Sequence, residues 1–139
     1  MKFYIDTNIL IDALLRRQPF HEKASALLNF ALNNKISIYT SSHCIATLHY
    51  VCKKNINETD LRSIISKFLE FIIIIPVDDN ILKKSAKSQH KDFEDAIQIL
   101  CAHQIKNLDG IITRNLKDFS SSEIPVFPPD EAINYIKNN

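Results

Sequence analysis

The 139-residue sequence contains a single glycine, Gly110. Loops that cradle the phosphates of a nucleotide need several glycines, because the backbone must approach the phosphates closely. The near absence of glycine therefore excludes sites of the Walker and dinucleotide-binding kinds. The GxSxG pattern of a serine nucleophile is also missing, and the histidines show no HxxxH spacing typical of a zinc site.

Cysteine is scarce and irregularly spaced. Cys44, Cys52 and Cys101 are odd in number and show no CxxC pattern. This spacing argues against a disulfide framework and against a zinc site. We expect reduced thiols that are buried within helices.

An excess of charge of one sign and a long apolar run are both missing. The chain has 17 Lys and Arg against 16 Asp and Glu, so it has no overall attraction to nucleic acid, and any polyanion site must be local. The longest strongly apolar stretch, residues 71–77, is far shorter than the ~20 residues of a membrane helix. The N-terminus does not resemble a secretory signal. These features predict a cytoplasmic protein with no membrane partner.

The hydrophobic pattern predicts a single domain, residues 1–139, in which short strands alternate with amphipathic helices. Strands that are separated by helices cannot pair as tight hairpins, so we expect a three-layer α/β/α sandwich with a mostly parallel central sheet. Thr7 or Asn8 is the expected N-cap of the first helix. Strands are expected at 2–5, 36–40, 72–77, 110–113 and 124–127, and helices at about 8–16, 21–33, 42–53, 57–71, 78–87, 92–106 and from 129 onwards.

Two of the expected strands end in polar side chains. Asp6 directly follows the first strand, and Asn115 and Asp118 follow the strand at 110–113. In an open α/β sheet, functional groups gather beyond the carboxyl ends of the strands. Taken singly, Asp118 is a common turn residue, but the repeated pattern predicts that these side chains share one edge of the sheet.

A further acidic group opens the long helix that precedes the fourth strand. Asp92 and Asp95 are three residues apart, which puts their side chains on neighbouring faces, whereas Glu94 is expected to point elsewhere. Helix capping is an equally good explanation for Asp92. Asp95 precedes an apolar segment and needs a partner. Clustered carboxylates repel one another unless a proton or a cation intervenes, so the pattern favours a hard cation such as Mg²⁺ or Mn²⁺.

The segments 3–8, 93–96 and 111–119 resemble the motifs of the PIN-domain family, in their usual order. The likeness spans nearly the whole chain. It implies an α/β/α sandwich and a Mg²⁺- or Mn²⁺-dependent ribonuclease that cleaves single-stranded RNA and leaves a 5′-phosphate and a 3′-hydroxyl. Many small bacterial members are VapC-like toxins of type II toxin–antitoxin pairs, so the resemblance implies an antitoxin partner. PIN proteins of this size often dimerise, which leaves a homodimer open.

The resemblance also assigns residues. Asp6 matches the first acid of the family and Asp95 the third, which implies that these two hold the metal. The second acid would stand at Thr47, and the last would stand at Asn115, in the triplet Thr113-Arg114-Asn115.

This altered set resembles a PIN subgroup in which Asp92, Asn115 and Asp118 would support the cation directly or through water. Arg114 is the cation expected to contact RNA, by a bidentate bond to a phosphate. A salt bridge to Asp118 or to Asp6 is the alternative for it.

Two other functions remain open. The neutral residues Thr47 and Asn115 favour a PIN-like module with weakened catalysis that binds RNA or protein. A phosphatase of the haloacid-dehalogenase kind would use Asp6 as a nucleophile, but such enzymes begin with a DxD pattern and this chain reads Asp6-Thr7-Asn8. A ribonuclease remains the leading prediction.

Overall fold

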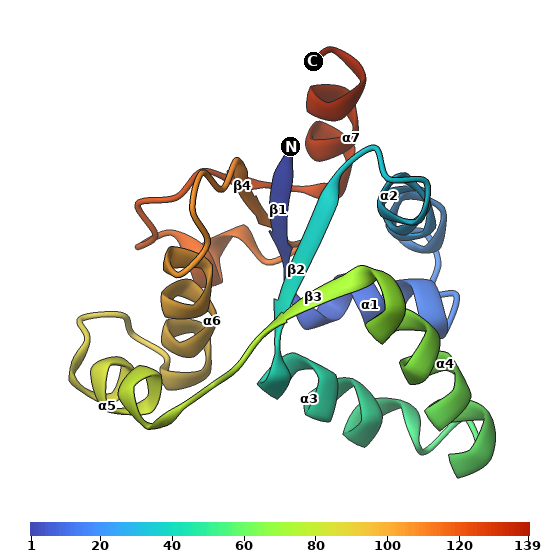
Figure 1. Ribbon diagram of the computed structural model, residues 1–139, viewed down its shortest axis with the longest axis horizontal. Helices are drawn as coiled ribbons and strands as arrows, with labels where there is room; N and C mark the ends of the chain where they lie inside the picture. The colour runs from blue at the N-terminus through green and yellow to red at the C-terminus, as the bar shows by residue number, and fades with distance from the viewer.

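A five-stranded sheet forms the centre of the molecule, which a computed structural model describes over residues 1–139 (Figure 1). All neighbouring strands are parallel, so the expected three-layer sandwich is confirmed with a wholly parallel sheet. The strand order is β3-β2-β1-β4-β5, with β1 at Lys2–Ile5, β2 at Ser37–Ser41, β3 at Ile72–Ile75, β4 at Gly110–Ile112 and β5 at Val126–Phe127.

Seven α-helices connect and flank the strands, and all seven were expected from the sequence. The main differences are a long helix that ends at His103 rather than near residue 106 and one additional 3₁₀ helix, η1. The helices are α1 (Thr7–Leu14), α2 (His21–Leu32), α3 (Ser42–Cys52), α4 (Glu58–Phe71), α5 (Asp79–Lys87), α6 (Phe93–His103) and α7 (Pro129–Lys137), and η1 covers Leu116–Phe119.

Each face of the sheet is covered by its own apolar core. Side chains alternate along β1, so Phe3 and Ile5 pack in the larger core with α1, α2, α4 and α7, whereas Tyr4 packs in the smaller core with α5 and α6. Figure 1 shows α5 and α6 on one side of the sheet and α1, α2 and α4 on the other. The cysteines are free and buried, as expected.

Polar side chains fix the starts of several helices. The N-cap of α1 is Asp6, and the prediction that Thr7 or Asn8 caps this helix was wrong. The Asp6 carboxylate accepts from the backbone N–H of Thr7 at 2.7 Å, because β1 ends at Ile5 and the helix begins at once. Asn57 caps α4 in the same way through the backbone N–H of Asp60.

The connections change from one face of the sheet to the other between the paired strands β1 and β4. The chain leaves β1 into α1 on one face and enters β4 from α6 on the opposite face, while Ile5 and Ile112 lie side by side in register. In open α/β sheets, ligands bind outside the carboxyl ends of the strands at such a switch point. Asp6 and Thr113 follow these two strand ends directly.

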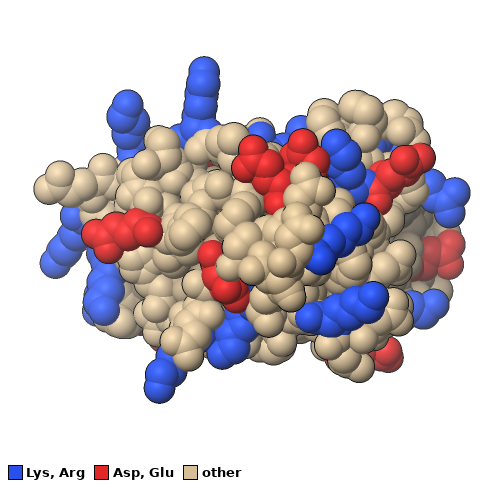
Figure 2. Space-filling model, turned by 90° about the horizontal axis from the view of Figure 1, so that it is seen from above, with Lys and Arg blue, Asp and Glu red and all other residues tan.

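Charges of both signs are mixed on one face of the molecule (Figure 2). Figure 2 shows the face at the top of Figure 1, where Lys and Arg side chains are interspersed with Asp and Glu and form no continuous basic patch. Among the helices, none combines the length and apolarity of a membrane-spanning segment.

Candidate active site

The carboxyl ends of β1 and β4 open into a cleft of about 230 Å³. Four of the predicted site residues line it together, although they come from distant parts of the chain: Asp6, Asp95, Asn115 and Asp118. The sheet edge and the first turn of α6 therefore meet as the sequence pattern predicted. The other lining residues are Thr7, Asn8, Ile11, His43, Thr47, Glu94 and Gln98.

Asp6 is almost completely buried, and hydrogen bonds use both of its carboxylate oxygens. Its Oδ1 accepts from the backbone N–H of Thr7 at 2.7 Å and from Nε2 of Gln98 at 2.9 Å. Its Oδ2 accepts from Oγ1 of Thr113 at 2.8 Å and from Nδ2 of Asn8 at 3.1 Å. A carboxylate has about four acceptor positions, so Asp6 is fully partnered and held in one orientation.

Asp95 has the opposite environment. Its backbone N–H donates to Asp92, but no hydrogen bond or salt bridge engages its carboxylate. The pKa of Asp95 is raised to about 7, first by burial and then by the negative charges of Asp118, Asp92, Asp6 and Glu94, in that order. The cleft therefore holds more negative charge than its own donors neutralise.

Asp92 lies outside the cleft lining. Its carboxylate accepts from the backbone N–H of Asp95 at 3.0 Å and caps α6. Helix capping, the alternative given by the sequence, thus describes its contact. Its charge still acts on Asp95 through space, and a catalytic role for Asp92 stays a prediction.

Glu94 does not point away from the site, as was predicted, but lines the cleft. Its Oε1 lies 3.8 Å from Nε2 of His43 on α3, across the cleft. The prediction was wrong because the cleft lies at the N-terminal end of α6, where the consecutive residues Glu94 and Asp95 both line it. Glu94 is also four residues from Gln98, which puts the two on the same helical face.

Thr47 on α3 lines the same cleft, at the position where the resemblance implies a second acid. Its hydroxyl brings no charge. On this wall of the cleft the ionisable groups are therefore His43 from α3 and Glu94 from α6.

Arg114 forms its salt bridge with a residue that the sequence analysis did not consider. It pairs with Asp12 on α1 rather than with Asp118 or Asp6, through Nε to Oδ2 at 2.6 Å and Nη2 to Oδ1 at 3.2 Å. Asp12 is 0% exposed, so this pair is largely removed from water.

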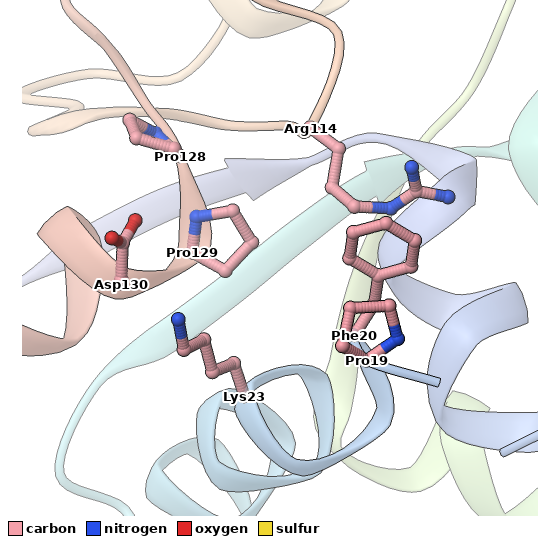
Figure 3. Close-up of a pocket in the computed structure, with 7 residues that line it drawn as sticks. All are labelled: Pro19, Phe20, Lys23, Arg114, Pro128, Pro129 and Asp130. Carbon is pink, nitrogen blue, oxygen red and sulfur yellow. The ribbon is translucent and has the colours of Figure 1, made fainter. Parts of the chain in front are cut away.

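The guanidinium of Arg114 also lies 3.8 Å from the centre of the Phe20 ring, which it covers (Figure 3). Two of its five N–H groups are used by Asp12, and the pocket of about 440 Å³ beside it also contains Lys23. Contact of Arg114 with an RNA phosphate remains a prediction.

The donors in the cleft suit a hard cation. Carboxylate and amide oxygens surround it, and Oδ1 of Asn8 is buried without any hydrogen-bond partner. Mg²⁺ and Mn²⁺ prefer such oxygens and retain several waters. No three His, Cys, Asp or Glu side chains converge as a ready-made metal site. The residues thus fit an ion that amide oxygens and waters help to hold, rather than an all-carboxylate cage.

Sequence reasoning missed Gln98 and Asp12, which are both buried polar residues. Each interrupts the apolar side of a helix, Gln98 within α6 and Asp12 within α1. That interruption was the available signal, because a polar side chain on a buried face must have a partner.

The chain is similar to proteins of one kind along nearly all of its length. A sequence model of the family described as PIN domain matches residues 2–117. Ribonuclease VapC1 of Aquifex aeolicus (strain VF5) is 29% identical over 135 residues, which cover 94% of this chain and 92% of the relative.

Solved structures agree with this similarity. A chain of a toxin-antitoxin complex from Klebsiella pneumoniae is 29% identical with a TM-score of 0.62, over 91% of this chain and 96% of that chain. A chain of VapBC2 from Rickettsia felis, bound to a DNA fragment from its promoter, shares the fold with a TM-score of 0.65 at 20% identity, over 92% and 98% of the two chains.

Proposed function

Because this chain belongs to the PIN-domain family, we propose that it is a Mg²⁺- or Mn²⁺-dependent endoribonuclease that cleaves single-stranded RNA. The observation that carries the proposal is the cleft in which Asp6, Asp95, Asn115 and Asp118 meet, with the pKa of Asp95 raised to about 7. A cation relieves this repulsion, and a phosphodiester needs the same cation. The similarity to a protein named ribonuclease supports the choice of RNA.

The environment of each residue in the cleft suggests its role. Asp95 and Asp6 would hold the ion, with Asp118 and Asn115 supporting it directly or through water. The ion supplies a water of lowered pKa and neutralises charge on the phosphate. The remaining N–H groups of Arg114 would bind a neighbouring phosphate of the RNA and orient the strand.

A second candidate function is an RNA- or protein-binding module with weakened catalysis. It is favoured by Thr47, whose hydroxyl stands in the cleft without a charge, and by the lack of three converging ionisable ligands. In that case the cleft would bind RNA and cleave it slowly or not at all.

Cleavage of single-stranded RNA separates the two functions. The native chain is incubated with Mg²⁺ or Mn²⁺, and Asp6→Asn and Asp95→Asn serve as matched variants that keep the size of each side chain. We expect metal-dependent cleavage by the native chain and loss of at least about 100-fold in both variants. Equal rates in all three, or RNA binding without cleavage, would contradict the nuclease and favour the binding module.

We also propose that the protein acts in the cytoplasm as the toxin of a toxin–antitoxin pair, as the names of its relatives suggest. An apolar pocket of about 540 Å³ lies between α1, α2 and α4, and Leu28, Ile64 and Phe68 line it. At its edge Leu32 is 57% exposed. An antitoxin segment with apolar side chains would bury this surface, whereas a homodimer would compete for it.

Co-purification tests the partner. The expected partner is a small protein encoded by a neighbouring gene, with a DNA-binding N-terminus and a helical tail. Leu32→Glu should abolish co-purification, whereas Leu82→Glu, on α5 across the sheet and 41% exposed, should not. If the Leu32→Glu variant still co-purifies with the partner as a one-to-one complex, the partner does not bind at this surface. If the native chain is a homodimer that Leu32→Glu dissociates, the surface serves self-association instead.

A further inference from the structure

Gln98 lies between the smaller core and the cleft, and it is 7% exposed. On the cleft side its Nε2 donates to Oδ1 of Asp6 at 2.9 Å. On the core side its Oε1 accepts from the hydroxyl of Tyr4 and from the thiol of Cys44, each at 3.1 Å. One buried amide therefore connects the core beneath the sheet to a carboxylate of the site.

The orientation of this amide follows from the chemistry of its neighbours. The carboxylate of Asp6 can only accept, so the amide must present its nitrogen to Asp6 and its oxygen to the core. Tyr4 must then donate to that oxygen. Burial raises the pKa of Tyr4 well above its usual value, which keeps the hydroxyl protonated and able to donate.

The contact restricts Asp6 at the oxygen that the other side chains do not reach. Thr113 and Asn8 both bind Oδ2, whereas Oδ1 has only Gln98 and the backbone N–H of Thr7. Without the amide, Oδ1 would keep only the backbone N–H of Thr7, so the carboxylate would be held less firmly in its orientation.

Resting on the proposed function, we propose that Gln98 is a positioning residue that fixes the Asp6 carboxylate for the cation, with its own orientation set by Tyr4 and Cys44. Residues that hydrogen-bond to a metal-binding side chain commonly change metal affinity by about 10- to 100-fold when they are replaced. Gln98 acts through Asp6 and need not touch RNA or the ion itself.

The hydrogen-bond relay is tested first on the metal-free protein, by a double-mutant cycle in urea unfolding. Tyr4→Phe should lower the unfolding midpoint of the native chain, because Gln98 loses a donor. In a Gln98→Met background the buried Tyr4 hydroxyl has already lost its Gln98 acceptor and keeps only the 3.6 Å contact with Sγ of Cys44, so the same change should be neutral or raise the midpoint. Additive effects would overturn the relay.

The positioning role is tested by titrating Mn²⁺ alone, without RNA. Gln98→Met should weaken Mn²⁺ binding at least about tenfold, while Ile99→Val, a packing change in the same helix, should leave it unchanged. Unchanged affinity in Gln98→Met, or an equal loss in both variants, would overturn the positioning role. A native chain that binds no Mn²⁺ would overturn the metal-dependent function itself and this role with it, and the urea cycle would then report only a structural network.

Discussion

Raising the pH from about 5 to about 9 should tighten cation binding at the cleft, because Asp95 loses its proton in this range. Its pKa is raised to about 7 by burial first and then by the charges of Asp118, Asp92 and Asp6. A cation binds the ionised carboxylate and not the protonated acid. Below pH 7, binding must therefore displace one proton from Asp95, whereas above about pH 8 it displaces none.

The size of the effect follows from that one proton. Each pH unit below the pKa weakens the apparent affinity by about tenfold, so binding at pH 5 should be about 100-fold weaker than on the plateau above pH 8. Calorimetric titration with Mn²⁺ in two buffers of different ionisation enthalpy measures both the affinity and the number of protons released. We expect close to one proton released at pH 5.5 and almost none at pH 8.5.

Two variants make this prediction specific. Asp118→Asn removes the neighbouring charge that raises the pKa of Asp95 most, so the pH at which affinity reaches its plateau should fall. Asp95→Asn removes the titrating group, so the remaining weak binding should lose its pH dependence in this range. An affinity that is constant between pH 5 and pH 7 in the native chain, with no proton release, would show that Asp95 does not bind the cation in its ionised form.

The same shift predicts the stability of the metal-free protein. Because the pKa of Asp95 is higher in the folded chain than its usual value of 3.8, the folded state binds the extra proton between these two values. This contribution to the free energy of unfolding is complete below about pH 4 and is lost as the pH rises through about 7. Urea unfolding at several pH values should show that decline in the native chain and a weaker one in Asp95→Asn.

Three further predictions concern the frame around the cleft. Gly110→Ala should lower the free energy of unfolding by about 1–3 kcal/mol, since its Cβ would stand 2.5 Å from Cε2 of Phe127, and thermal unfolding checks this as a fall of roughly 3–10 °C. Arg114→Ala should lower the free energy of unfolding in urea by about 3–5 kcal/mol, more than Asp12→Asn does, because it leaves the buried Asp12 carboxylate with only the 4.0 Å contact to Arg17, and equal losses would count against the pair. Thr47→Glu should tighten Mn²⁺ binding on the order of tenfold by adding a charged ligand, and weaker binding in calorimetry would show that this wall does not face the ion.

The fold was predictable because its signals are local. The apolar runs at 2–5 and 72–75 are typical of buried strands, and the helices between strands require parallel pairing. The position of Asp6 at a strand end was equally readable. The short helix η1 was not, since the polar segment after β4 has no apolar period and its conformation depends on the tertiary packing of Phe119.

The errors in the site arose from side-chain direction. Periodicity places Glu94 on a face of α6, but only the packing of α3 against the sheet decides that this face meets the cleft. Arg114 was expected to pair with Asp118 in its own motif or with Asp6 at the end of the first strand, whereas its partner is Asp12, 102 residues away in the sequence. Contacts over such separations leave no periodic trace in a single sequence.

The two carboxylates that match the family pattern have contrasting environments, which determines how an ion can be accommodated. The carboxylate of Asp95 accepts no hydrogen bond, so a cation that binds it needs to displace only a proton. Asp6 has all four acceptor positions filled, so an ion there must replace one donor. Asn8 is the most easily replaced, because its bond to Asp6 is the longest of the four at 3.1 Å and its own Oδ1 has no partner. Gln98, held in place by two donors from the core, would remain and keep the carboxylate in position.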